Sequence, residues 1–230
     1  MMTVNIRLRN TKPRPKIHPW ARTALPILCA AGLALHLGGC VGTVVGVGAT
    51  AATAAAEERG LAEAATDLRI RTTINTLWLD HSEDMTLALN LDISEGRVLI
   101  TGVVPKEAMR ADAIRLAKRA KGVRQIIDEI RVVEGDDGTS FVRDGLITTQ
   151  LRTRITLDNE IQAINYAVET VGGTVYLMGI AQNPAELTRV RDHARALPYV
   201  RRIVSHVVMK DDPSRPNAAQ SNAASNGAAP

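Results

Sequence analysis

The chain is poor in aromatic residues and in cysteine, and the shortage of cysteine limits the disulfides that it can form. Aromatic residues make up 3% of the 230 positions, and only one of them is a phenylalanine. The two cysteines are Cys29 and Cys40, and Cys29 lies in an N-terminal leader, so a chain without that leader cannot form an internal disulfide. The sequence also lacks a nucleophile elbow, a phosphate-binding loop and a dinucleotide fingerprint. It therefore predicts neither an enzyme nor a bound cofactor.

Acidic residues are missing from residues 1–39, which hold six of the 28 basic residues. The rest of the chain has 22 basic side chains against 24 acidic ones, a formal net charge of −2. The basic character of the whole chain therefore belongs to the leader. Because the remainder has no excess of cations to neutralise phosphates, we expect no nucleic-acid partner.

The leader has the order of parts that an export signal requires. Its basic stretch is followed by the apolar run 24–37, which is too short to span a bilayer as a stable helix. The string Leu37-Gly38-Gly39-Cys40 then resembles the lipobox of bacterial lipoproteins. That resemblance implies a signal peptide over 1–39, cleavage before Cys40, and acyl chains on Cys40. An ordinary secretory signal that contains a cysteine is the alternative.

Residues 40–60 join this cysteine to the first folded element. Positions 41–56 contain only Gly, Ala, Val and Thr. Gly42 and Gly46 have the spacing of close helix packing, which would suit a membrane-associated or self-associating segment. A flexible connection is the interpretation we favour, because the segment is too short to span a membrane. By resemblance to lipoprotein sorting, Val41 after the cysteine favours the outer membrane over the inner one.

The remainder is one unit written twice, at a constant offset of 77 residues. The matching pairs include Ile70 and Ile147, Ile74 and Leu151, Gly96 and Gly173, Val98 and Val175, Gly102 and Gly179, and Ile126 and Ile203. A gapless series of this length is not expected by chance. We predict two domains, over 61–134 and 141–210, joined by a linker at 135–140 and followed by a disordered tail at 211–230.

Each copy predicts the element order αββαβ, which makes an α+β fold with a three-stranded sheet and two helices. In the first copy the expected strand has Met85, Leu87, Leu89, Leu91 and Ile93 on one face, and in the second copy Ile164, Tyr166 and Val168. A short turn and a returning strand follow, over 97–103 or 174–180. The helix of the second copy has a capping pattern at Asn183, and the last strands cover 123–133 and 200–209. The alternation predicts one sheet face buried under the helices and the other in water, and it permits the two copies to pack through their sheets without requiring it.

The segments GRVLITGVVP and GTVYLMGIAQNP, with the closing strands GVRQIIDEIRV and YVRRIVSHVVM, resemble the BON domain. Two such domains behind a lipobox are similar to the dual-BON outer-membrane lipoproteins of the DolP type. The resemblance implies a non-enzymatic protein on the periplasmic face of the outer membrane. It also implies binding to anionic phospholipid, a role in envelope integrity, and an association with the β-barrel assembly machinery.

In these relatives the first helix of the second domain meets the lipid, and here that helix reads FVRDGLITTQLRTRI. The family motif has an aromatic residue before Ile-Thr-Thr, where this chain has Leu146, with Phe141 a little more than one turn earlier. The candidate lipid-binding residues are Phe141, Arg143, Leu146, Arg152 and Arg154. In the alternative interpretation these arginines form a solvated face and Leu146 extends the core.

The basic helix, the tryptophan and the histidines of the two repeats favour structural roles over binding roles. The basic helix over 106–121 is balanced by nearby acids, so a solvated face is favoured over a lipid patch. Trp78 matches Ile155 in the second copy, which predicts a core position. His81, His193 and His206 lie in different elements without ligand spacing, so no metal site is expected. The alternative function is a tethered adaptor that binds an envelope protein rather than lipid headgroups.

Overall fold

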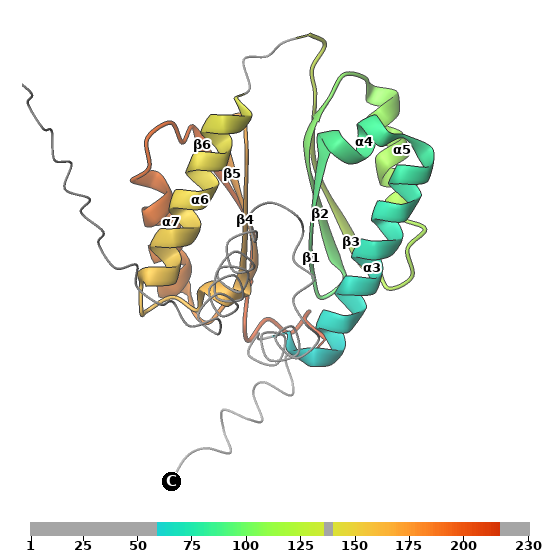
Figure 1. The fold of residues 1–230 in the computed structure, drawn as a ribbon. Helices are drawn as coiled ribbons and strands as arrows, with labels where there is room; N and C mark the ends of the chain where they lie inside the picture. Colours follow the sequence, from blue (N-terminus) through green and yellow to red (C-terminus); the bar gives the residue numbers. More distant parts are fainter. Residues whose placement is uncertain (1–58, 136–139, 217–230) are drawn as a thin grey trace, which may run out of the picture. The chain divides into compact units, whose positions relative to one another are not determined.

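The structure, a computed structural model, describes residues 59–135 and 140–216, which fold as two successive repeats (Figure 1). The first repeat consists of α3 (Gly60–His81), α4 (Glu83–Ala88), β1 (Leu89–Ser94), β2 (Arg97–Val104), α5 (Glu107–Ala117) and β3 (Gln125–Val132). The second consists of α6 (Phe141–Leu157), the 3₁₀ helix η2 (Ala163–Asn165), β4 (Tyr166–Val171), β5 (Thr174–Ala181), α7 (Pro184–Arg195) and β6 (Arg202–Met209). The predicted α+β class and the tandem arrangement are confirmed.

Each repeat has a mixed three-stranded sheet with the hairpin and crossover that the sequence predicts. The strand orders are β1-β2-β3 and β4-β5-β6. The hairpin strands are antiparallel, and the third strand runs parallel to the middle one after a crossover helix, α5 or α7. The hairpin registers are equivalent, because Leu89 pairs with Gly102 and Tyr166 pairs with Gly179.

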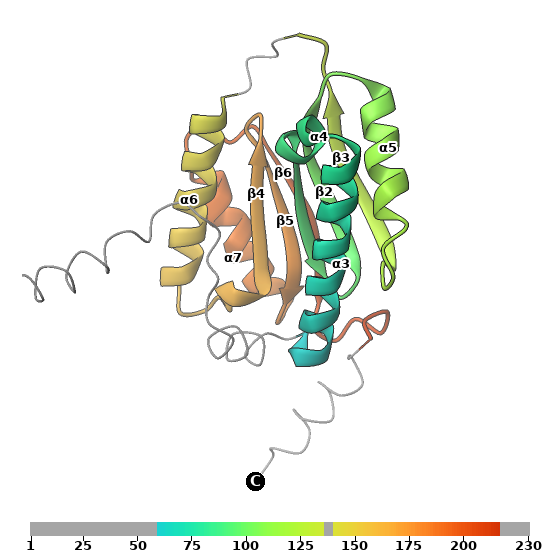
Figure 2. The same ribbon diagram turned by 45° about the vertical axis from the view of Figure 1, so that its right-hand side comes forward.

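The helices cover one face of each sheet, as Figure 2 shows for α3 and α5 over the sheet of the first repeat. Ile70, Ile74 and Trp78 of α3 are buried there against the small side chains of α5. Trp78 also donates a hydrogen bond of 3.1 Å from Nε1 to the carbonyl oxygen of Ala113. The prediction that Trp78 is a core residue is therefore confirmed.

The first strand of each repeat is shorter than its alternating pattern suggested. Ser82 caps α4 by accepting a hydrogen bond from the backbone N–H of Met85, so the chain is still helical at Leu87, whose side chain is 77% exposed. In the second repeat Ile164 belongs to η2 and is also exposed. The expected strand positions of Met85, Leu87 and Ile164 are therefore wrong, because a local cap and a 3₁₀ turn replace the early part of each strand.

A buried aspartate from the first helix holds the hairpin turn of each repeat. The carboxylate of Asp67 accepts hydrogen bonds from the backbone N–H groups of Glu95 and Gly96, at 2.9 and 2.8 Å. Asp144 does the same for the two glycines of the second turn, at 2.7 and 2.9 Å. Buried carboxylates are stabilised by such N–H donors. The first helix and the hairpin are therefore joined by polar contacts as well as by the core.

The second face of the sheets is not in water, which corrects the prediction from the strand pattern. Both repeats belong to one compact unit, and a separate apolar cluster contains side chains from both. Its buried members are Leu99, Ile127, Val171, Tyr176 and Met178. The middle strands are apolar on both faces, as expected for strands that are covered on both sides.

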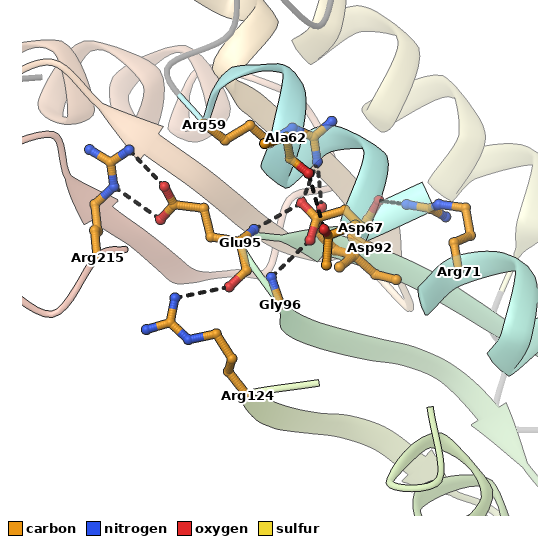
Figure 3. A network of polar contacts seen from close by, with 11 residues as sticks. Arg59, Ala62, Asp67, Arg71, Asp92, Glu95, Gly96, Arg124 and Arg215 are labelled. Atoms are coloured by element: carbon orange, nitrogen blue, oxygen red, sulfur yellow. Dashed lines mark hydrogen bonds and ion pairs between the residues drawn. The ribbon is translucent and has the colours of Figure 1, made fainter. Parts of the chain in front are cut away.

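Residues that follow β6 fix the second repeat to the hairpin of the first (Figure 3). The guanidinium of Arg215 donates two hydrogen bonds to the carboxylate of Glu95, at 3.0 and 2.9 Å, and both side chains are 2% exposed. Arg124 donates to the carbonyl oxygen of Ser214 at 3.1 Å. The expectation of disorder from Asp211 onward is therefore wrong for residues 211–216, since this buried ion pair orders them.

Candidate functional site

Helix α6 presents the surface on which the sequence placed the candidate residues. Ser140 caps the helix by accepting a hydrogen bond from the backbone N–H of Arg143. One side of the helix is buried against the sheet, through Asp144, Ile147, Thr148, Leu151 and Ile155. The residues between these positions therefore point to the outside of the repeat.

Several large apolar side chains are exposed at the N-terminal end of α6. Phe141 is 82% exposed, and Val142 and Leu146 are also exposed. Tyr199, from the connection between α7 and β6, is exposed beside them. We call Phe141, Val142, Leu146 and Tyr199 the α6 patch. An exposed apolar cluster of this kind is more typical of a binding surface than of a solvated helix face.

A groove of about 330 Å³ runs between α6 and the Tyr199 connection. Its lining is mainly apolar, with Ser140, Val142, Arg143, Leu146, Ile147, Gln150, Pro198 and Tyr199 around it. Two members of the predicted set, Arg143 and Leu146, thus share one groove.

Arg143 supplies a positive charge at this groove. Its guanidinium lies 5.3 Å from the centroid of the Tyr199 ring, within the range of a cation–π contact. Within residues 59–135 and 140–216, no carboxylate pairs with Arg143. The charge of Arg143 is therefore available to an anionic group from outside the protein.

The other two predicted arginines lie elsewhere on the helix. Arg152 donates a hydrogen bond of 2.6 Å to the carbonyl oxygen of Val168 and lies 3.9 Å from a carboxylate oxygen of Glu169. Its guanidinium is thus turned to β4. Arg154 is exposed two helical turns beyond Leu146. The structure brings Arg143 and Leu146 together at the groove. Phe141 is exposed at the start of the helix but does not line the groove, and Arg152 and Arg154 lie further along the helix.

Threonines extend the uncharged character of the outer side of α6. Thr153 donates its hydroxyl to the carbonyl oxygen of Thr149 at 2.9 Å, and Thr156 donates to that of Arg152 at 2.7 Å. Because these hydroxyls are satisfied by the helix itself, the threonines need no partner from water or from another protein. The exposed Leu157 continues this side to the end of the helix.

A second cavity, of about 630 Å³, has a different chemistry. Arg71, Asp92 and Glu169 are among its lining residues. Burial raises the pKa of Asp92, against the guanidinium of Arg71, which lowers it. Burial and the neighbouring charge of Asp92 raise the pKa of Glu169. Two acids beside arginines leave no surplus positive charge for an anion, so this cavity does not resemble a headgroup site.

The histidines contact carboxylates rather than one another. Each of the three histidines in the described part of the chain contacts a carboxylate: His81 with Asp112 at 3.3 Å, His193 with Asp158 at 2.8 Å, and His206 with Glu129 at 2.9 Å. Within the described part of the chain, no group of three or more His, Cys, Asp or Glu side chains could hold a metal ion. Cys40 and the rest of the leader lie outside the described residues. Of the helices that are described, none is sufficiently long and apolar to cross a membrane.

Sequence reasoning missed Tyr199, which forms one wall of the groove. Its position matches Gly122 in the first repeat, at the same offset of 77 residues. The signal in the sequence was an aromatic residue at a position where the other copy has glycine.

Comparison with known proteins agrees with this architecture. The BON domain model matches residues 66–134 and 143–211. An uncharacterized protein from the gshII 5′ region of Anaplasma centrale is 36% identical over 125 residues, which are 54% of this chain and 82% of that protein. The outer membrane lipoprotein DolP of Haemophilus influenzae is 29% identical over 64% of this chain and 77% of its own length. The osmotically-inducible protein Y of Escherichia coli is 22% identical over 63% of this chain and 73% of its own length. Two matched domains cover more than half of the sequence, and the chain therefore belongs to the BON-domain family.

Proposed function

We propose that the protein is held by acyl chains on Cys40 at the periplasmic face of the outer membrane, where the α6 patch binds anionic phospholipid and supports envelope integrity. Membership of the BON-domain family makes it a non-enzymatic protein related to envelope proteins. The similarity to an outer membrane lipoprotein supports the anchored location.

The observation that carries this proposal is the combination of exposed apolar side chains with an unpaired arginine. Val142 and Leu146 are exposed beside Arg143 at the groove, and Phe141 is exposed at the start of the same helix. Arg143 has no carboxylate partner among the described residues. Burial of apolar surface contributes about 25 cal/mol per Å². A basic residue near an anionic membrane contributes roughly 1 kcal/mol. The α6 patch therefore matches an interface that is apolar inside and negatively charged at its surface.

Lipid binding by the folded part can be tested apart from the anchor. Residues 59–216 contain both hydrophobic cores and the buried pair of Glu95 and Arg215, so this segment is the appropriate soluble fragment. We expect it to co-float with phosphatidylglycerol vesicles and to float less with vesicles of phosphatidylcholine alone. Circular dichroism melting of each fragment verifies that it is folded.

The decisive variant carries Leu146→Glu with Arg143→Glu, because both residues line the groove. A matched control carries Leu87→Glu with Arg119→Glu, an exposed leucine and arginine of the first repeat. The first variant is expected to lose co-flotation and the control to retain it. Equal flotation of both variants would contradict lipid binding by the α6 patch.

The alternative function, a tethered adaptor for an envelope protein such as the β-barrel assembly machinery, is favoured by helix α3. Leu61, Leu68 and Leu79 are exposed at spacings that place them along one side of this helix. Between them, Thr72 and Thr76 donate their hydroxyls to helix carbonyl oxygens, at 2.9 Å in each case. A helix with apolar residues on its outer side as well as its inner side fits a partner surface.

Crosslinking in intact cells tests the adaptor. A photoreactive residue at Leu68 is expected to capture a specific envelope protein if α3 is a docking face. The same photoreactive residue at Arg119, an exposed position in the turn after α5, is the control. Identical crosslinking patterns at both positions would contradict a docking role for α3.

A further inference from the structure

Tyr199 occupies a backbone position that suits glycine. Its φ is 69°, in the left-handed region, and it is one of two non-glycine residues with positive φ in the described part of the chain. The matching position in the first repeat is Gly122, with φ of 100°. Bulky side chains are disfavoured in this region, whereas glycine adopts it freely. The backbone conformation at position 199 therefore does not require a tyrosine. A bulky residue held in a strained conformation is often part of a functional site.

The tyrosine side chain does not serve the core. It is 67% exposed, while Leu197, two residues earlier, is buried in the hydrophobic cluster under α6 and α7. Among the residues that the structure describes, its hydroxyl has no hydrogen-bond partner. Its one specific contact is the guanidinium of Arg143 over the ring, and a cation–π contact at an exposed site is weak. Packing thus gives no compensation that would explain the strained position.

The position of Tyr199 in the groove beside α6 suggests a role in binding. The ring forms the wall of the apolar groove opposite Leu146, next to the exposed Val142. Tyrosine combines an apolar ring with a polar tip, and it concentrates where hydrocarbon meets lipid headgroups. Arg143 at the same ring has no carboxylate partner in the described ranges, so it can meet a phosphate at that depth.

We infer that Tyr199 is the interfacial anchor of the α6 patch: its ring lies at the glycerol level of an anionic phospholipid, the lipid chain occupies the groove beside Leu146, and Arg143 contacts the phosphate. This inference rests on the proposed function. The strained tyrosine is retained for lipid contact rather than for folding.

The test uses the mature, acylated protein in vesicles of phosphatidylglycerol and phosphatidylcholine, with or without bromine on the acyl chains near the glycerol. Three variants each add one tryptophan: Tyr199→Trp, Leu146→Trp, and Leu87→Trp as an exposed control on the first repeat. The signal of the parent protein, which keeps one tryptophan, Trp78, after cleavage before Cys40, is subtracted. Because all three variants have the same anchor, differences in quenching report the depth of each position.

We expect brominated lipid to lower the added fluorescence at least two-fold at positions 199 and 146 and to leave position 87 unchanged. Quenching at 146 without quenching at 199 would overturn the role of Tyr199 and leave the proposed function standing. The absence of quenching at both positions would overturn both.

A stability measurement separates this role from a structural one. Tyr199→Gly restores the residue type found at Gly122, so its melting temperature is expected to equal or exceed that of the parent. Tyr176→Ala, which removes a buried tyrosine from the cluster between the sheets, is expected to melt lower. If Tyr199→Gly melted as low as Tyr176→Ala, the tyrosine would serve the fold and the inference would fail.

Discussion

Glu129 and His206 occupy the same position in their respective repeats, 77 residues apart, and they contact each other at 2.9 Å between Oε1 and Nε2. The same relationship holds for Leu99 and Tyr176, which share the apolar cluster between the sheets. Arg97 adds a hydrogen bond of 2.9 Å to the carbonyl oxygen of His206. When equivalent positions meet in this way, the two copies pack as the halves of a symmetric dimer do, here within one chain.

The two repeats are therefore expected to unfold together. Leu99→Ala removes a buried side chain that both repeats share, and such a change costs about 2–5 kcal/mol. Urea unfolding of the variant, followed by circular dichroism and by Trp78 fluorescence, should remain a single transition at lower urea. Leu87→Ala, at an exposed position, is the control. Two separate transitions in the parent protein would contradict the shared core.

The buried pair of Arg215 and Glu95 predicts that a substitution beyond the last strand, β6, lowers the free energy of unfolding by several kcal/mol. Arg215→Ala leaves the carboxylate of Glu95 buried without its bidentate partner, which costs roughly 3–5 kcal/mol. Adding Glu95→Gly, the residue type at the matching Gly172, is expected to recover most of the loss, since no buried charge is then unpaired. A cost below about 0.5 kcal/mol for Arg215→Ala, as at an exposed position, would contradict the buried contact.

Asp92, in the second cavity of about 630 Å³, predicts how the free energy of unfolding changes with pH. Burial raises the pKa of Asp92, so the folded protein holds this proton to higher pH than the unfolded chain. Below the unfolded pKa both states are protonated and there is no penalty. As the pH rises through the folded pKa, the penalty of a buried charge develops and stability falls. Asp92→Asn is therefore expected to be more stable than the parent near pH 7 and to lose that advantage near pH 3.

Urea unfolding at a series of pH values tests this expectation. Asp128→Asn is a suitable comparison, because Asp128 is ion-paired with Arg110 at 2.9 Å and its loss removes a favourable contact. If Asp92→Asn lowered stability near neutral pH as Asp128→Asn does, the effect of burial on Asp92 would be smaller than that of Arg71.

The repeat and the hairpin glycines were enough to predict the element order, because both copies carried the same pattern in the sequence. The ends of the first strands were not predictable from alternation alone. Apolar residues at Met85 and Leu87 fit a strand, but the side chain of Ser82 begins a short helix there. Local capping therefore overrode the two-residue period.

The contact between the sheets was visible in the sequence only in the middle strands. Val98, Leu99 and Ile100 are apolar in succession, which is typical of a strand covered on both faces, whereas Asn90 and Asp92 of the neighbouring strand suggested a wet face. These polar residues line the cavity instead. The position of Tyr199 beside α6 depends on tertiary packing, so only its mismatch with Gly122 marked it.

The proposed function requires acyl chains on Cys40 that hold the two repeats at a membrane surface. Intact-mass spectrometry of the protein purified from its native membranes tests this most directly. We predict a mature chain that begins at Cys40 and has the added mass of a diacylglycerol and an N-linked acyl group. A mature chain that begins at another residue, without lipid and released with the soluble periplasmic fraction, would contradict the account.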